Sequence, residues 1–224
     1  MGALRASAQT ISYELALGLS IVGVIMMYGT FNLTEMTLAQ QGPMSFTWMG
    51  HTITSNYLPN WGIFFQPLAA LLFFSATFAE SNRLPFDLAE GESELVAGFH
   101  TEYGGFKFNM FFIGEYGHMM ISAGLMTLFF FGGFGIPYVS VAQVQEWAAS
   151  VTSTAGGASG LVAVLHFLSF MIKFSLFLWI FIWVRWTLPR FRYDQLMDLG
   201  WKTMLPWALG NTVLTAFVIY IASL

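Results

Sequence analysis

Long apolar stretches alternate with shorter polar segments along this chain. Five stretches are long enough to cross a membrane, since a bilayer core needs about 20 apolar residues per helix. They cover residues 7–31, 61–79, 108–134, 161–186 and 205–224. The pattern predicts an all-α fold, a polytopic transmembrane helix bundle with five membrane-spanning helices, as a single integral-membrane domain over residues 1–224.

The polar segments between the predicted spans differ in character. Residues 32–60 are rich in turn formers, and residues 135–160 contain the small-residue run STAGGASG, so both are predicted to be loops. Residues 80–107 form a third loop, which is acidic. The acidic loop is therefore the first candidate for chemistry.

Composition supports a membrane protein and excludes several cofactors. The chain is 56% hydrophobic and only 9% charged, whereas a soluble domain has about 25% charged residues. It contains no cysteine, which excludes an iron–sulfur cluster or a thiolate zinc site held by this chain. No histidine spacing indicates a metal site either.

The basic residues predict an orientation. Residues 32–60 and 135–160 contain no lysine or arginine, whereas one side of the predicted bundle collects Arg5, Arg83, Lys107, Arg185, Arg190, Arg192 and Lys202. By the positive-inside rule the second group is cytoplasmic. The acidic loop is therefore predicted to lie at the cytoplasmic face.

A dense group of carboxylates marks residues 79–116. Seven of the twelve acids of the chain lie there, namely Glu80, Asp87, Glu90, Glu92, Glu94, Glu102 and Glu115. Only Arg83 and Lys107 oppose them. Crowded carboxylates that lose solvation repel one another and favour shared protons. The cluster therefore indicates proton relay or charge-sensitive switching.

Local signals offer simpler roles for some of these acids. Asp87, with Glu90 three residues later, is typical of a helix N-cap and its partner, and Glu92 and Glu94 fit an ordinary solvated face. Glu80 and Arg83 could be an interfacial ion pair. Glu80 and Glu115, at the ends of predicted spans, are the better candidates for proton relay.

Three further positions place ionisable groups within predicted spans. Glu14 lies two turns into the first span, where a charge costs about 2.5–3.5 kcal/mol; we expect an inward-facing functional group or a carboxyl bonded to Tyr13 or Ser12. Lys173, in the middle of the fourth span, is expected to pair with a carboxylate. Glu115 shares a helix face with His118.

Three segments resemble a known family. Residues 80–108 read ESNRLPFDLAEGESELVAGFHTEYGGFKF, residues 4–14 read LRASAQTISYE, and residues 183–202 read WVRWTLPRFRYDQLMDLGWK. The chain resembles the quinone-chamber membrane subunit of NADH:quinone oxidoreductase (respiratory complex I), the family that includes mitochondrial subunit 1. The likeness covers nearly the whole chain, and its motifs are specific.

The chain departs from the family pattern at several points. Ser81 stands for a usual threonine, Ala89 for a proline and Lys107 for a frequent arginine. Family members typically have eight spans, and this chain starts where the fourth would start. We therefore expect a fragment of a longer protein.

The resemblance implies a role in a proton-pumping translocase of the bacterial inner membrane. The quinone cavity would be lined by Arg83, Asp87, Glu90, Glu92, Glu94, Glu102 and Lys107. The residues that couple quinone reduction to proton translocation would be Glu14, Glu80, Glu115 and Lys173. Ubiquinone or menaquinone would be the substrate. NAD, FMN and iron–sulfur clusters would lie on partner subunits of the hydrophilic arm, and small and antiporter-like membrane subunits would be further partners.

Two other classes of protein remain as alternatives. A membrane subunit of an energy-converting hydrogenase would share the helices without reducing a quinone, and neighbouring genes would distinguish it. A stand-alone proton-conducting membrane protein, or a structural anchor, would not need a large acidic loop and should survive purification without partners.

Overall fold

The chain is mostly helical. The computed structural model describes residues 2–48, 51–81, 86, 103–152, 155–189 and 191–223. The helices are α1 (Gly2–Tyr28), α2 (Leu33–Ala39), α3 (Gly62–Phe65), α4 (Pro67–Glu80), α5 (Phe106–Phe130), α6 (Val141–Val151), α7 (Ala155–Thr187), α8 (Tyr193–Asp198), the π-helical turn η2 (Leu199–Met204) and α9 (Leu205–Ser223). The strands are β1 (Pro43–Trp48) and β2 (His51–Pro59).

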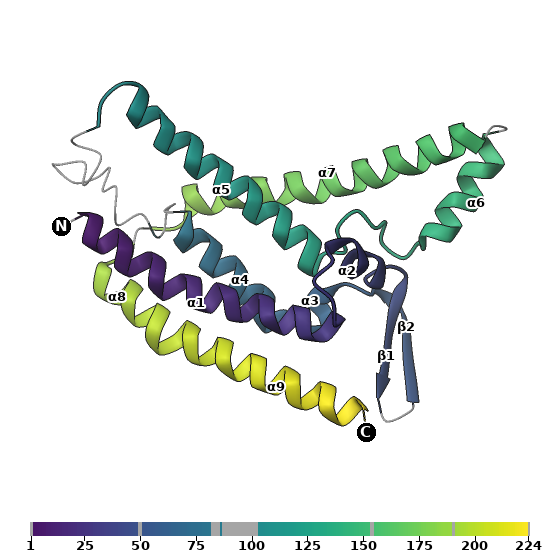
Figure 1. Cartoon of the computed structure of the whole chain (residues 1–224), viewed down its shortest axis with the longest axis horizontal. Helices are drawn as coiled ribbons and strands as arrows, with labels where there is room; N and C mark the ends of the chain where they lie inside the picture. The colour runs from purple at the N-terminus through teal and green to yellow at the C-terminus, as the bar shows by residue number, and fades with distance from the viewer. Residues whose placement is uncertain are drawn as a thin grey trace.

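The long helices lie side by side, with α1 packed against both α4 and α9, and with α5 packed against α7 (Figure 1). The end of α4, the start of α5 and the start of α1 lie toward one end of the structure, which we call the acidic-loop end (Figure 1). The hairpin of β1 and β2 lies toward the other, which we call the hairpin end. These two ends contain different chemistry.

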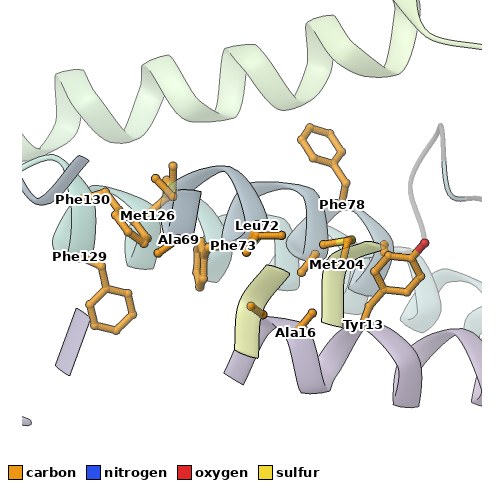
Figure 2. Packing of buried hydrophobic residues seen from close by; sticks show 14 of the residues in the cluster. Tyr13, Ala16, Ala69, Leu72, Phe73, Phe78, Met126, Phe129, Phe130 and Met204 are labelled. Carbon is orange, nitrogen blue, oxygen red and sulfur yellow. The ribbon is translucent and has the colours of Figure 1, made fainter. Parts of the chain in front are cut away.

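The core combines small and aromatic side chains. Ala16, Ala69 and Ala76 are fully buried where α1 meets α4, since small residues let two helix backbones approach closely. Phe73 packs edge-on to Phe129 at 6.1 Å between ring centroids (Figure 2). This packing fixes α4 between α1 and α5, and so sets the positions of the groups at its two ends.

The predicted second span is interrupted. Gln66 lies between α3 and α4 with φ −133° and ψ 63°, outside helical geometry, and Pro67 begins α4. Proline has no backbone N–H and is suited to the first turn of a helix. The segment predicted as one helix over 61–79 is therefore two, and its longer part ends at Glu80.

Both segments predicted as loops contain regular structure. Within 32–60 the chain forms α2 and then an antiparallel hairpin that pairs Ser45 with Thr54 and Phe46 with Ile53. Within 135–160 it forms α6, whose first turn is capped by Ser140 and Gln143, and the start of α7. The all-α prediction missed the hairpin. Apolar and polar residues alternate along β1 from Met44 to Trp48, but they do not alternate throughout β2.

Three of the described helical segments are long and apolar enough to cross a membrane. They cover Ser7–Tyr28, Gly156–Thr187 and Tyr193–Ala222. α4, at 14 residues, is about 21 Å long at 1.5 Å per residue, shorter than a bilayer core. α5 is 25 residues long but includes Lys107, Glu115 and His118. Three of the five predicted spans are therefore confirmed as helices of sufficient length and apolar character, and the count of five is not.

Candidate functional site

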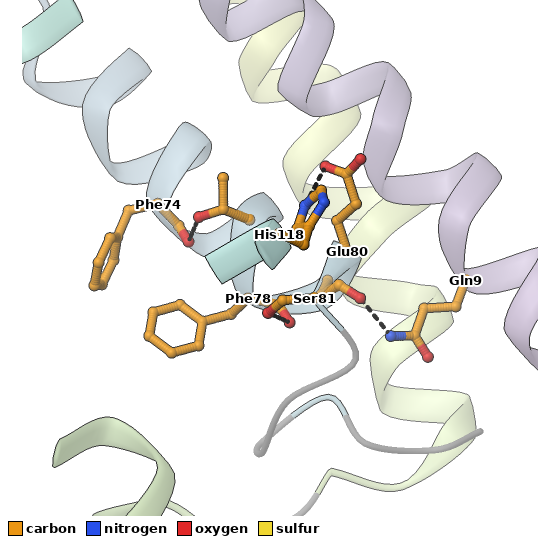
Figure 3. A network of polar contacts seen from close by, with 8 residues as sticks. Gln9, Phe74, Phe78, Glu80, Ser81 and His118 are labelled. Atoms are coloured by element: carbon orange, nitrogen blue, oxygen red, sulfur yellow. Dashed lines mark hydrogen bonds and ion pairs between the residues drawn. The ribbon is translucent and has the colours of Figure 1, made fainter. Parts of the chain in front are cut away.

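The candidate site is the junction of α4 and α5 at the acidic-loop end. Glu80 is the last residue of α4, and His118 lies in α5, which packs against it. His118 Nε2 is 3.6 Å from Glu80 Oε2, and the two side chains point toward one another (Figure 3). At 3.6 Å the contact is too long for a hydrogen bond but short enough for an ion pair when the imidazole is protonated.

The pair is partly shielded from its surroundings. The His118 side chain is 33% exposed and that of Glu80 is 25% exposed. Within the described residues, His118 Nε2 has no hydrogen-bond partner. The 3.6 Å contact therefore brings a carboxylate and an imidazole together without a hydrogen bond between these two side chains.

The sequence motif around α5 places a second carboxylate beside this pair. Glu115 precedes His118 by three residues on the same continuous helix and is half-buried. Side chains three apart on a helix share a face. Glu115 therefore lies on the same face of α5 as His118, whereas the contact at this end that joins two elements is the one between Glu80 and His118.

A buried amide from α1 fixes the end of α4. Gln9 is fully buried, and its Nε2 donates to Ala79 O at 2.7 Å (Figure 3). The same nitrogen donates to Phe86 O at 2.9 Å. Phe86 is itself buried and packs edge-on to Tyr13 at 5.6 Å. Sequence reasoning missed Gln9 because it counted charges, whereas the available signal was an uncharged amide within an apolar helix.

Glu14 does not face inward within the described bundle. It is exposed, because the buried face of α1 consists of Tyr13, Ala16 and Ser20, and Glu14 lies about 100° around the helix from Tyr13. The expected local partners also differ. Tyr13 OH donates to Leu196 O at 2.8 Å, and Ser12 Oγ donates to Ala8 O at 2.7 Å.

Lys173 contacts backbone carbonyls where a carboxylate was expected. Its Nζ donates to Gly135 O at 2.6 Å and to Gly133 O at 3.1 Å, and it lies 5.3 Å from the centre of the Trp61 ring. Both carbonyls follow α5 at the hairpin end. Since Glu115 lies 15 residues before the end of α5, about 22 Å away along the helix, Lys173 is not part of the Glu80–His118 group.

Lys107 is exposed in the first turn of α5. The remaining predicted cavity residues lie outside the described residues, namely Arg83, Asp87, Glu90, Glu92, Glu94 and Glu102. The predicted cap at Asp87 and the predicted short helix after it lie there too.

These features define a class, a helical membrane protein with ionisable groups gathered where two helices flank an acidic loop. A model of the NADH dehydrogenase family matches residues 1–216. The chain is 84% identical, over all its 224 residues and 58% of the relative, to a NADH-quinone oxidoreductase subunit of Bdellovibrio bacteriovorus. The chain belongs to the NADH dehydrogenase family.

More distant relatives agree with this assignment. The chain is 44% identical over 226 residues to a NADH-quinone oxidoreductase subunit of Leptospira biflexa, covering 100% of this chain and 52% of the relative. It is 43% identical over 215 residues to a subunit of the same enzyme from Cytophaga hutchinsonii, covering 96% of this chain and 54% of the relative. The chain thus spans little more than half the length of these curated relatives.

Proposed function

We propose that this chain forms part of the quinone-side membrane subunit of a proton-pumping NADH:quinone oxidoreductase. The observation that supports this most is the 84% identity to a subunit of a NADH-quinone oxidoreductase along the whole chain. The apolar spanning helices and the acidic loop agree with it. The hydrophilic arm, with NAD, FMN and iron–sulfur clusters, and the other membrane subunits would be its partners.

In this proposal the acidic loop lines the quinone cavity through Arg83, Asp87, Glu90, Glu92, Glu94, Glu102 and Lys107. Reduction of a quinone to a quinol consumes two electrons, supplied from a partner subunit, and two protons. The charge and proton demand in the cavity therefore change at each turnover. Arg83 and Lys107 would balance part of the negative charge of the loop.

Glu80, His118 and Glu115 would transmit that change into the membrane. The loose 3.6 Å contact suits this role, because a proton on His118 attracts the Glu80 carboxylate and its loss releases it. Glu14 is exposed on α1. It would extend the proton path only where another segment or subunit covers the face of α1 on which Glu14 lies. For Lys173 we favour a different role, holding the turn after α5.

The same proposal includes five membrane crossings in the inner membrane of a bacterium. α3 and α4 together cover residues 62–80, about 28 Å if continuous, close to the roughly 30 Å of a bilayer core. α5, at 25 residues, is long enough. The basic residues at the acidic-loop end would then be cytoplasmic.

Substitution of the carboxylates within the assembled complex tests this function. We expect Glu80→Gln and Glu115→Gln to lower coupled NADH:quinone turnover about tenfold or more, while NADH oxidation by an artificial acceptor stays intact. Glu146→Gln, an exposed change on α6, is the matched control. Normal turnover and proton pumping in both variants would contradict the relay.

A further inference from the structure

One face of α7 carries a stripe of large exposed side chains. Ile172, Leu176, Trp179, Trp183 and Trp186 recur at intervals of four and three residues, which places them on one side of the helix. Each is at least 50% exposed, and Trp186 is 82% exposed. The stripe covers 14 residue steps, about 21 Å of the helix. We call it the tryptophan face.

The opposite face of α7 packs on the bundle. Phe181 is buried, and its ring lies 4.3 Å from that of Phe78 near the end of α4, measured between centroids. Phe181 follows Trp179 by two residues, about 200° around the helix. The tryptophan face therefore points away from the bundle, and α7 ends toward the acidic-loop end (Figure 1). In the predicted orientation this end is cytoplasmic.

The tryptophan face offers hydrogen-bond donors and no side-chain acceptor. Trp179 and Trp183 stack with their ring centroids 5.3 Å apart. Each indole has one donor, Nε1, and no acceptor. The three indoles make no hydrogen bond to the residues that the structure describes. Tryptophan is enriched at membrane boundaries because its ring stays in the hydrocarbon while its N–H finds an acceptor in the polar layer.

A positive charge lies next to these donors. Arg185, in the last turn of α7, is half-buried and directly precedes Trp186. Within the described part of the chain it makes no ion pair and no hydrogen bond. At the same end of the bundle, Lys202 Nζ is 2.8 Å from Asp198 Oδ1. Arg185 thus has a charge for which the described residues supply no counter-ion.

These features fit a lipid better than a further helix. Helices that associate within a membrane meet through small residues, which let their backbones approach closely, and the tryptophan face has none. A helix packed on it would also have to supply acceptors for three indoles. A glycerophospholipid supplies ester and phosphate oxygens at one end and apolar chains at the other, and arginine matches the geometry of a phosphate.

We propose that the tryptophan face and Arg185 bind an anionic glycerophospholipid of the cytoplasmic leaflet. The phosphate accepts hydrogen bonds from the Arg185 guanidinium and from Trp186 Nε1, and an ester carbonyl accepts one from Trp183 Nε1. The acyl chains lie along Leu176 and Ile172. Neither this site nor its test depends on quinone chemistry.

Photolabelling tests the proposal on the intact complex in phosphatidylcholine nanodiscs. The probes are phosphatidylglycerol and phosphatidylcholine with the same diazirine-bearing acyl chain. Arg185→Gln removes the charge, and Trp186→Phe removes the indole N–H but keeps an aromatic ring. The matched controls are Lys202→Gln, a cation already paired with Asp198, and Trp147→Phe, a 53% exposed indole on α6. Native gels establish that each variant assembles, and mass spectrometry locates the label.

We expect phosphatidylglycerol to label residues 172–186 about fivefold more than phosphatidylcholine in the wild type and both controls, equivalent to about 1 kcal/mol for one basic residue. Arg185→Gln should abolish this preference, and Trp186→Phe should lower it about threefold, the effect of one hydrogen bond. Equal labelling by the two lipids in the wild type would overturn the proposal. So would a preference that survives Arg185→Gln or falls as far in Lys202→Gln, or a lack of label on α7 because a partner subunit covers it.

Discussion

Two polar sites at opposite ends of the helix bundle differ in how their side chains are bonded. At the acidic-loop end, Glu80 and His118 face each other across 3.6 Å. At the hairpin end, Gln40 is buried and makes four hydrogen bonds, donating to Met36 O and Leu128 O and accepting from Gly62 N and Gly132 N. The Gln40 amide, with all four of its hydrogen bonds made, holds the scaffold, whereas Glu80 and His118 contact each other without a hydrogen bond between them.

The turn at residues 132–135 shows how tightly the hairpin end is fixed. Gly132 and Gly133 adopt positive φ angles of 70° and 48°, which side chains other than glycine rarely tolerate. A methyl group at Gly133 would also lie 2.7 Å from the Thr37 side chain. Gln40 binds one side of this turn and Lys173 the other. The turn is thus held by side chains from two separate elements.

The largest effect is expected for Gln40→Leu. The change leaves Leu128 O, Gly62 N and Gly132 N without a side-chain partner. Each buried group left unpaired costs about 1 kcal/mol or more, so the free energy of unfolding should fall by about 3 kcal/mol or more. We expect little assembled complex on native gels. Gln145→Leu, the same change at an exposed position on α6, should assemble normally, and equal assembly of both variants would refute the structural role of Gln40.

A smaller loss of stability is expected for Lys173→Met. The charged amine makes two bonds to carbonyls, and hydrogen bonds to charged groups contribute about 1.5–3 kcal/mol each. Removing the amine also removes the cost of holding a charge in a half-buried site, so the net loss is smaller than that for Gln40→Leu. The thermal midpoint of the complex should fall, whereas the pumping ratio of the surviving complex should stay normal. If the thermal midpoint were normal and the number of protons pumped per NADH fell, Lys173 would instead belong to the proton path.

The smallest effect is expected for Gln9→Leu. This variant changes a neutral buried amide at the acidic-loop end, so it can be compared with Gln40→Leu at the hairpin end. Loss of the bonds to Ala79 O and Phe86 O should lower quinone turnover several-fold and raise KM for the quinone, since these bonds position the entry to the loop. Assembly on native gels should be retained. An unchanged KM would show that Gln9 has no positioning role.

The sequence predicts the positions of the long helices better than it predicts the hydrogen bonds of buried side chains. Long apolar runs located α1, α4, α5, α7 and α9. The role of Glu80 and Glu115 in proton relay stays a prediction. The hydrophobic pattern could not show that a new helix, α4, begins at Pro67. It also could not show that Lys173 donates to backbone carbonyls, or that the buried side chains of Gln9, Gln40 and Gln66 hydrogen-bond to distant parts of the chain. Such amide contacts join residues 22 to 149 positions apart, and nothing local in the sequence marks them.

The most direct test of the central claim is a double-mutant cycle on Glu80 and His118, read out as protons pumped per NADH oxidised by the intact complex. If the two residues act as one unit, Glu80→Gln and His118→Gln should each lower the ratio, and the double variant should be no worse than the more impaired single variant. Independent losses that multiply in the double variant, or a normal ratio in both single variants, would contradict a coupled pair.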